Sequence, residues 1–125
     1  MLRKVISPRR KRNDGAKAEQ LAEHYLVQQG YQFITRNFHS RQGEVDLIMR
    51  NGPTIVFVEV RYRADASRGS AAESITKQKY LRCLKTAEYW LIKNNLQSSQ
   101  YQIDVIAIDG LLDINNIHWL KAVQI

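Results

Sequence analysis

The 125-residue sequence has few cysteines and no long apolar run, the features that stabilise small proteins by disulfides or zinc or attach them to membranes. Its one cysteine, Cys83, excludes an internal disulfide, and no Cys/His spacing is typical of a zinc site. No apolar run approaches the roughly 20 residues that a membrane span needs. No long apolar stretch follows the basic N-terminus, a pattern that is not typical of a secretory signal. We therefore expect a globular protein of the reducing cytoplasm, without a membrane partner.

Acidic residues are also scarce, at 12 against 19 basic ones, which gives a net charge of +7. This excess is typical of a protein with a polyanionic partner, because Lys and Arg that neutralise phosphates release counterions. A solvated surface that is merely basic is the alternative interpretation. The length favours one domain with its own hydrophobic core. We expect residues 1–13 to form a flexible basic tail and residues 14–125 a single domain.

Hydrophobic periodicity and turn signals predict the element order α-β-β-β-α-β-β. Asp14 is the candidate N-cap of the first helix, and Ser70-x-x-Glu73 is a candidate capping box for the second. Hairpins combined with a crossover helix predict an α/β fold with a mixed β-sheet flanked by helices. The predicted helices cover about residues 17–29 and 71–94, and the strands about residues 31–38, 44–50, 54–62, 101–109 and 117–125.

The third predicted strand holds the most informative pattern. Its continuous apolar run, residues 55–58, is typical of a central strand that is covered on both faces. The run ends in Glu59-Val60-Arg61. A carboxylate at the end of a buried strand is costly unless it is paired or bound to a metal ion.

The loop at Asn51-Gly52 decides which carboxylates meet across the predicted hairpin. A two-residue loop would set Glu44 opposite Glu59, with Asp46 on the diagonal. A four-residue loop would set Asp46 directly opposite Glu59, and Glu44 would face Arg61. Both registers place Asp46 and Glu59 on one face, whereas a three-residue loop would separate them.

Converging carboxylates at a sheet edge are typical of a site for a hard cation such as Mg²⁺. Such an ion can polarise a phosphodiester, orient water and stabilise charge on the leaving oxygen. Without a cation, one of the carboxylates must take up a proton. The alternative is a structural ion-pair cluster of Glu44, Glu59 and Arg61 that binds no ligand.

Two motifs carry a resemblance to a known family. The segments Gly43-Glu44-Val45-Asp46-Leu47-Ile48 and Phe57-Val58-Glu59-Val60-Arg61 resemble those of the YraN-like bacterial proteins, which are predicted endonucleases. Their fold is similar to that of the restriction-endonuclease and Holliday-junction-resolvase superfamily, called PD-(D/E)xK. The resemblance runs from about Gly15 to the C-terminus. It implies a restriction-endonuclease-like fold and a Mg²⁺- or Mn²⁺-dependent hydrolase of DNA, with branched or junction DNA among the candidate substrates.

The resemblance also implies roles for individual residues. Asp46 matches the metal-binding aspartate of the superfamily, and Glu59 matches its second acidic ligand. The backbone carbonyl of Val60 is a further candidate ligand, and Glu19 matches an outer acidic position in the first helix. Arg61 stands where the superfamily usually has lysine.

The arginine matters because a lysine can lose its proton and activate water, whereas arginine stays charged. Arg61 is therefore expected to hold the scissile phosphate rather than to act as a base. Lys79 is the candidate for the role of the missing lysine, and Lys77 is the second choice. Arg63 and Arg68, in the loop after the third strand, are candidate contacts to a DNA strand.

Three hypotheses follow from the sequence. The first is a metal-dependent DNA endonuclease, which as a homodimer could cut both strands. The second is a non-catalytic nucleic-acid-binding protein on a nuclease fold, motivated by Arg61. The third is a scaffold protein whose charge cluster is purely structural.

Overall fold

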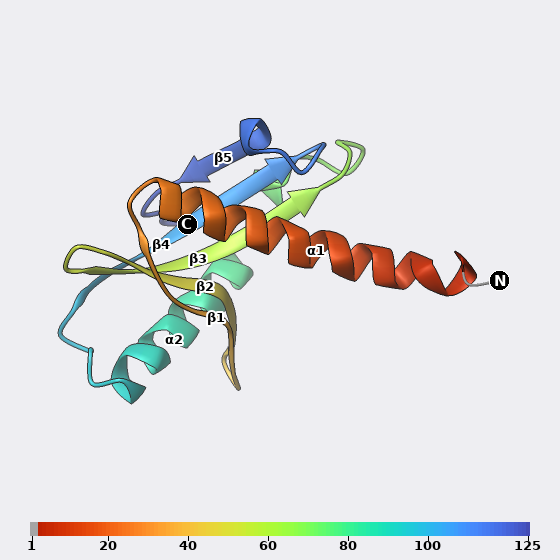
Figure 1. Cartoon of the computed structure of the whole chain (residues 1–125). Helices are drawn as coiled ribbons and strands as arrows, with labels where there is room; N and C mark the ends of the chain where they lie inside the picture. The colour runs from red at the N-terminus through yellow and green to blue at the C-terminus, as the bar shows by residue number, and fades with distance from the viewer. Residues whose placement is uncertain (1–2) are drawn as a thin grey trace.

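The computed structural model describes residues 3–125, with side chains from residue 13 onward. One five-stranded sheet carries α1 on one face and α2 on the other (Figure 1). The predicted α/β class, element order and restriction-endonuclease-like architecture are confirmed. No helix in this part of the chain is long and apolar enough to cross a membrane. The elements are α1 (Arg3–Gln28), β1 (Gln32–Ser40), β2 (Gly43–Asn51), β3 (Thr54–Arg63), the 3₁₀ helix η1 (Ala72–Ser74), α2 (Lys77–Lys93), β4 (Gln100–Asp109), the 3₁₀ helix η2 (Ile114–Asn116) and β5 (Ile117–Leu120).

The sheet is mixed and follows the order of the chain, from β1 to β5. β3 and β4 are parallel and joined through α2, while the other neighbouring strands are antiparallel. β3 lies in the centre, as predicted, and its residues 55–58 are fully buried. Val56 and Val58 pack in the core under α1, whereas Ile55 and Phe57 pack against α2. The alternation of these side chains explains why the run is apolar at every position.

α1 buries the predicted face, with Ala18, Ala22 and Leu26 fully enclosed. The predicted start is wrong, because the helix begins at Arg3, so that Asp14 lies inside it and is no N-cap. The added segment is rich in Lys and Arg, which are good helix formers, and extending an existing helix costs little. Residues 1 and 2 lie outside the described part, and the flexibility of the basic tail stays a prediction.

The second helix begins later than predicted. Ser70 and Glu73 do form the reciprocal capping box, with N···O distances of 2.8 and 3.2 Å, but it closes only the short η1. Ile75 is extended, and Thr76 then caps α2 by accepting the Lys79 N–H at 3.2 Å. Ile75 and Thr76 are both β-branched, which lowers their helix propensity, and the Thr76 hydroxyl caps a new helix start. Both effects favour this break over a continuous helix.

The last strand is shorter than predicted and ends at Leu120. Ala122 has a left-handed backbone, with φ of 49°, which turns the chain away from β4. The Val123 N–H then donates to the Ile103 carbonyl at 2.8 Å. The C-terminal residues are therefore held by single contacts rather than by a continued ladder.

Candidate metal and nucleic-acid site

The β2–β3 hairpin adopts the register of the four-residue loop. Asn51 pairs with Thr54, and the ladder continues to Leu47 opposite Val58. Asp46 is the next residue of β2 and Glu59 the next of β3, so the two acidic residues stand where the ladder ends. The predicted convergence of Asp46 and Glu59 is thus built into the hairpin register.

The β1–β2 ladder is interrupted beside Asp46, whose side chain bonds to β3. On the other side of β2, the register pairs Arg36 with Leu47 but omits Asn37 and Asp46, and Asn37 has a left-handed φ of 53°. The Asp46 carboxylate accepts the Val60 N–H at 2.8 Å. A side chain thereby replaces the backbone bond that the ladder would have supplied.

Both central carboxyls are shielded from water. Asp46 is 7% exposed, and the Glu59 side chain is 16% exposed. Burial, reinforced by the nearby Asp46, raises the pKa of Glu59 to about 8. Burial also raises the pKa of Asp46, although the Val60 N–H opposes this. Among residues 13–125, no side chain or backbone N–H donates to the buried Glu59 Oε1, so a proton shared with Asp46 or a bound cation is needed to satisfy it.

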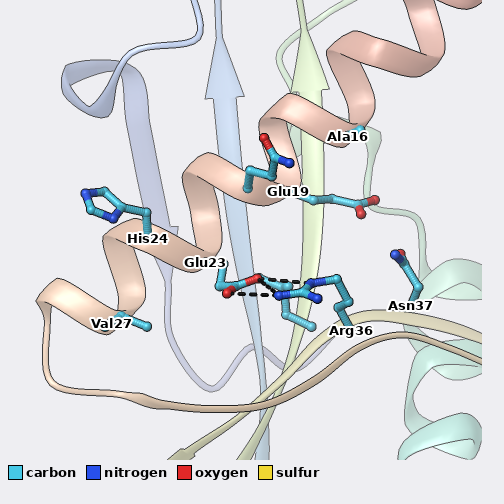
Figure 2. A pocket seen from close by; sticks show the side chains of 9 residues that line it. Ala16, Glu19, Glu23, His24, Val27, Arg36 and Asn37 are labelled. Carbon is cyan, nitrogen blue, oxygen red and sulfur yellow. Dashed lines mark hydrogen bonds and ion pairs between the residues drawn. The ribbon is translucent and has the colours of Figure 1, made fainter.

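Glu19 approaches the pair from α1. Burial raises its pKa to about 7, with further contributions from Asp46 and Glu44. Glu19 and Asn37 both line a cavity of about 570 Å³ between α1 and the edge of the sheet (Figure 2). In the same cavity Glu23 and Arg36 form a 3.0 Å ion pair, drawn with dashed lines in Figure 2. Glu19 therefore lies close enough to Asp46 for the two charges to interact, and its role as an outer ligand stays a prediction.

Protein side chains alone do not complete a metal site in residues 13–125. No three His, Cys, Asp or Glu side chains in this part of the chain are grouped as a metal-binding cluster. A cation at Asp46 and Glu59 would therefore need backbone oxygens, water or substrate phosphate as further ligands. Mg²⁺ commonly binds in this way, through one or two carboxylates with several retained waters.

Two cationic side chains flank Glu59 and share one anchor, Ser74. The Arg61 guanidinium donates to Ser74 Oγ at 2.8 Å and lies 3.9 Å from Glu59 Oε2. Lys79 Nζ donates to the Ser74 carbonyl at 3.3 Å. Burial and the charge of Arg61 lower the pKa of Lys79. Sequence reasoning missed Ser74, because it lies in the break between η1 and α2 that the helical pattern concealed.

A hollow of about 410 Å³ opens between the end of the sheet and α2. Arg82 was missed by sequence reasoning, although it follows Lys79 by one helical turn and could have been found by that spacing. Glu44 does not face Arg61. It is exposed and lies 3.5 Å from His39 instead, because the β2–β3 ladder stops short of it. The lining residues are His39, Ser40, Gly43, Glu44, Glu59, Arg61, Lys79, Arg82 and Cys83.

The other predicted nucleic-acid contacts lie elsewhere. Arg63 donates to the Arg68 carbonyl at 3.4 Å, in the loop that follows β3. Lys77 opens α2 and is exposed. None of the three lines the hollow, whereas Arg61 and Lys79 both do.

The fold and site define a class of protein. A mixed five-stranded sheet covered by one helix on each face is consistent with the restriction-endonuclease-like fold, and in this chain two buried carboxyls stand where the β2–β3 ladder ends. The chain belongs to the uncharacterised protein family UPF0102, whose model matches residues 18–108. This is the YraN-like family that the two motifs resemble.

Curated relatives cover most of the chain. A UPF0102 protein of Marinomonas sp. (strain MWYL1) is 46% identical over 112 residues, which are 90% of this chain and 88% of the relative. A UPF0102 protein of Vibrio cholerae is 46% identical over 88% of this chain and 90% of its own length. A UPF0102 protein of Vibrio campbellii is 47% identical over 89% and 91%, respectively. Asp46, Glu59, Arg61 and Lys79 all lie inside the segment that the family model matches.

Proposed function

We propose that this protein is a Mg²⁺- or Mn²⁺-dependent endonuclease that hydrolyses DNA phosphodiester bonds. The unpartnered, buried Glu59 Oε1 beside Asp46 is the observation that carries the proposal. Without a cation, Glu59 must hold a proton up to about pH 8, and a bound cation would take the place of that proton. The net charge of +7 supports a polyanionic substrate.

Asp46, Glu59 and the Val60 carbonyl would hold the ion. The Val60 N–H points to Asp46, and in a strand the N–H and C=O of one residue face the same neighbour. The Val60 carbonyl therefore faces the gap left where the β2–β3 ladder ends. These are oxygen ligands, which hard cations prefer, and Glu19, whose charge interacts with Asp46, would orient a water beside them.

The bound ion would supply Lewis-acid polarisation of the phosphate and a more acidic water. Arg61 would bind the non-bridging phosphate oxygens, since Ser74 fixes its Nε and leaves the other N–H groups free to donate. Lys79 would orient the attacking water and take its proton, because its lowered pKa makes the neutral amine more accessible. Arg63, Arg68 and Lys77 would contact more distant phosphates, at positions outside the hollow.

The test is a calorimetric titration with Mg²⁺ and Mn²⁺, followed by cleavage assays on duplex, tailed and junction DNA. We expect saturable binding and metal-dependent cleavage for the wild type, and neither for Asp46→Asn. Glu88→Gln is the matched control, because it removes one exposed carboxylate of α2 outside the hollow. Cleavage that survives Asp46→Asn would refute the assignment.

A second candidate function is non-catalytic binding of nucleic acid. It is favoured by Arg61, whose guanidinium is tied to Ser74 and cannot act as a base. This function predicts salt-sensitive DNA affinity without hydrolysis at any metal concentration. The metal titration, repeated with DNA present, separates the two candidates.

Assembly and location complete the proposal. One carboxylate pair per chain would cut one strand, so a homodimer with two-fold symmetry would suit cleavage of both strands. Sedimentation with and without DNA measures this. A cytoplasmic location, expected from the single cysteine, would give the enzyme access to bacterial DNA.

A further inference from the structure

One face of α2 carries a stripe of cationic and aromatic residues that extends beyond the candidate site. Its members recur every three or four residues and therefore share a face. They are Lys79, Arg82, Thr86, Tyr89 and Lys93. Lys79 belongs to the hollow at Glu59, and the far end of the stripe lies about 21 Å along the helix axis.

The end of the β1–β2 hairpin crosses this stripe at its middle. Gly43 makes the close approach possible, since a Cβ there would lie 3.3 Å from Thr86 Oγ1 and 3.4 Å from the Arg82 Cβ. Its φ of +146° also disfavours other residues. Thr86 is fully buried beneath the hairpin and donates to the Arg82 carbonyl at 2.8 Å. The hairpin end is thus seated firmly on α2.

A second hollow of about 270 Å³ lies beyond the hairpin end. It shares His39 and Ser40 with the first hollow, so the two hollows are adjacent at the hairpin end. Its other lining residues are Arg41, Gln42, Tyr89 and Lys93.

The exposed ring of Tyr89 lines this second hollow. Phe38 stacks on its ring, with centroids 6.2 Å apart and planes at 24°, and Tyr89 remains 44% exposed. Lys93 Nζ lies 5.9 Å from the centroids of both rings. An exposed aromatic ring beside cationic side chains is the combination that binds unpaired bases together with their phosphates.

We propose that the second hollow binds an unpaired nucleotide. This nucleotide belongs to the same DNA strand as the scissile phosphate, which lies at Arg61 and Lys79. Its base stacks on Tyr89, and its phosphate lies against Lys93 and Arg41. The substrate class is therefore DNA with a single-stranded segment beside the scissile bond. This inference rests on the proposed endonuclease function for the scissile bond, although the binding hollow itself can be tested alone.

The experiment measures DNA affinity by fluorescence anisotropy in metal-free buffer, where cleavage does not interfere. The probes are a blunt duplex and the same duplex with a single-stranded tail. We expect Tyr89→Leu to weaken binding of the tailed duplex about 10-fold and to leave the blunt duplex unchanged. Tyr89→Phe is the matched control that retains the ring, and it should bind both probes like the wild type.

A second variant tests the cation independently of the ring. Lys93→Gln should reduce the slope of log affinity against log salt by about 0.7 on the tailed duplex, the loss of one phosphate contact to a single strand. Lys85→Gln is the control, because Lys85 is exposed on α2 outside the stripe. Equal effects of Tyr89→Leu on both probes, or no effect on either, would overturn the inference.

Failure of this inference can be distinguished from failure of the proposed function. If metal-dependent cleavage occurs but Tyr89→Leu cuts tailed and blunt DNA as the wild type does, the hollow is refuted and the endonuclease stands. If no DNA is cut but tail binding depends on Tyr89, the hollow stands and the endonuclease is refuted.

Discussion

Two buried acidic positions in the same sheet have opposite surroundings. Asp104 in β4 is fully buried, yet both of its oxygens are saturated with donors. Its Oδ1 accepts Gln102 Nε2 at 2.8 Å and the Ala122 N–H at 2.9 Å. Its Oδ2 accepts Trp119 Nε1 at 3.0 Å and the Tyr31 hydroxyl at 3.4 Å.

The Asp46–Glu59 pair has far fewer donors. Asp46 receives the Val60 N–H, and Glu59 Oε1 receives none. Both pKa values are raised, mainly by burial. A buried carboxylate whose oxygens all accept hydrogen bonds stabilises the fold. A buried pair with too few donors lowers the stability of the fold, and proteins keep such pairs where a ligand binds. Replacing the carboxyl by an amide should therefore lower activity at Asp46 or Glu59, and should lower the stability of the fold at Asp104.

The largest expected effect is on catalysis. Asp46→Asn and Glu59→Gln should each lower metal-dependent cleavage by about 10³-fold, since several kcal/mol of charge stabilisation are lost with the ion. Neither variant should lose stability in metal-free buffer, because Glu59 is already uncharged below about pH 8 and an amide oxygen at position 46 can still accept the Val60 N–H. Single-turnover cleavage and urea denaturation of the same samples measure both effects. A destabilised Asp46→Asn protein would favour the structural-cluster hypothesis.

Asp104→Asn should give the reverse result, a loss of stability with the site chemistry intact. The amide replaces one acceptor oxygen with an NH₂ group that faces two donors, which leaves them buried and unsatisfied. The free energy of unfolding should fall by about 3 kcal/mol. Urea denaturation measures it, and a metal titration of the folded variant should match the wild type. An unchanged denaturation midpoint would show that Asp104 contributes nothing through its donors.

Lys79→Gln tests whether the site uses a base beyond its carboxyls. Cleavage should fall about 100-fold, within the range of general acid–base contributions. Because the pKa of Lys79 is lowered, the wild-type rate should also rise toward alkaline pH as Lys79 loses its proton, and the variant should lose this rise. Lys85→Gln is the matched control on the same helix, because Lys85 is exposed and does not line the hollow. An identical pH–rate profile in Lys79→Gln would assign the base role elsewhere.

The raised pKa values predict a pH-dependent stability for the metal-free protein. Glu59, with a pKa of about 8, and Glu19, with a pKa of about 7, hold protons in the folded state that the unfolded chain releases near pH 4.5. Their contribution is complete below pH 4.5, and the free energy of unfolding falls as pH rises from there to about 8. Thermal unfolding at several pH values measures it. Glu59→Gln should flatten the profile, and Mg²⁺ should raise the Tm more at pH 8 than at pH 5.

The sequence was sufficient to predict the sheet and the central carboxyls. The apolar run of β3 and the Asn51-Gly52 turn are local signals, and both acceptable registers placed Asp46 and Glu59 on one face of the sheet. The two helix starts were mispredicted for different reasons. Asp14 was predicted as an N-cap, but the basic segment before it is also helical. Thr76, rather than the Ser70 capping box, caps α2.

The surroundings of the site could not be predicted. Ser74 holds Arg61 and Lys79 only because the chain breaks between η1 and α2, a break that periodicity does not encode. The donors of Asp104 include Tyr31 and Trp119, which lie far from it in the sequence. Its hydrogen bonds therefore depend on the tertiary packing. Sequence patterns locate a buried carboxyl, but only the packed structure determines whether donors reach it.

Tyr31→Phe gives the smallest effect and the finest test of the comparison. The variant removes the most distant donor of Asp104, at 3.4 Å, and leaves the other three in place. The Phe ring can keep the edge-to-face contact with Trp119, whose centroid lies 5.3 Å away. We expect a loss of about 0.5 kcal/mol in the free energy of unfolding, at the low end for a single hydrogen bond. A loss as large as that of Asp104→Asn would mean that one hydroxyl, rather than the full donor set, satisfies the carboxylate, and the contrast with Glu59 would then rest on a single bond.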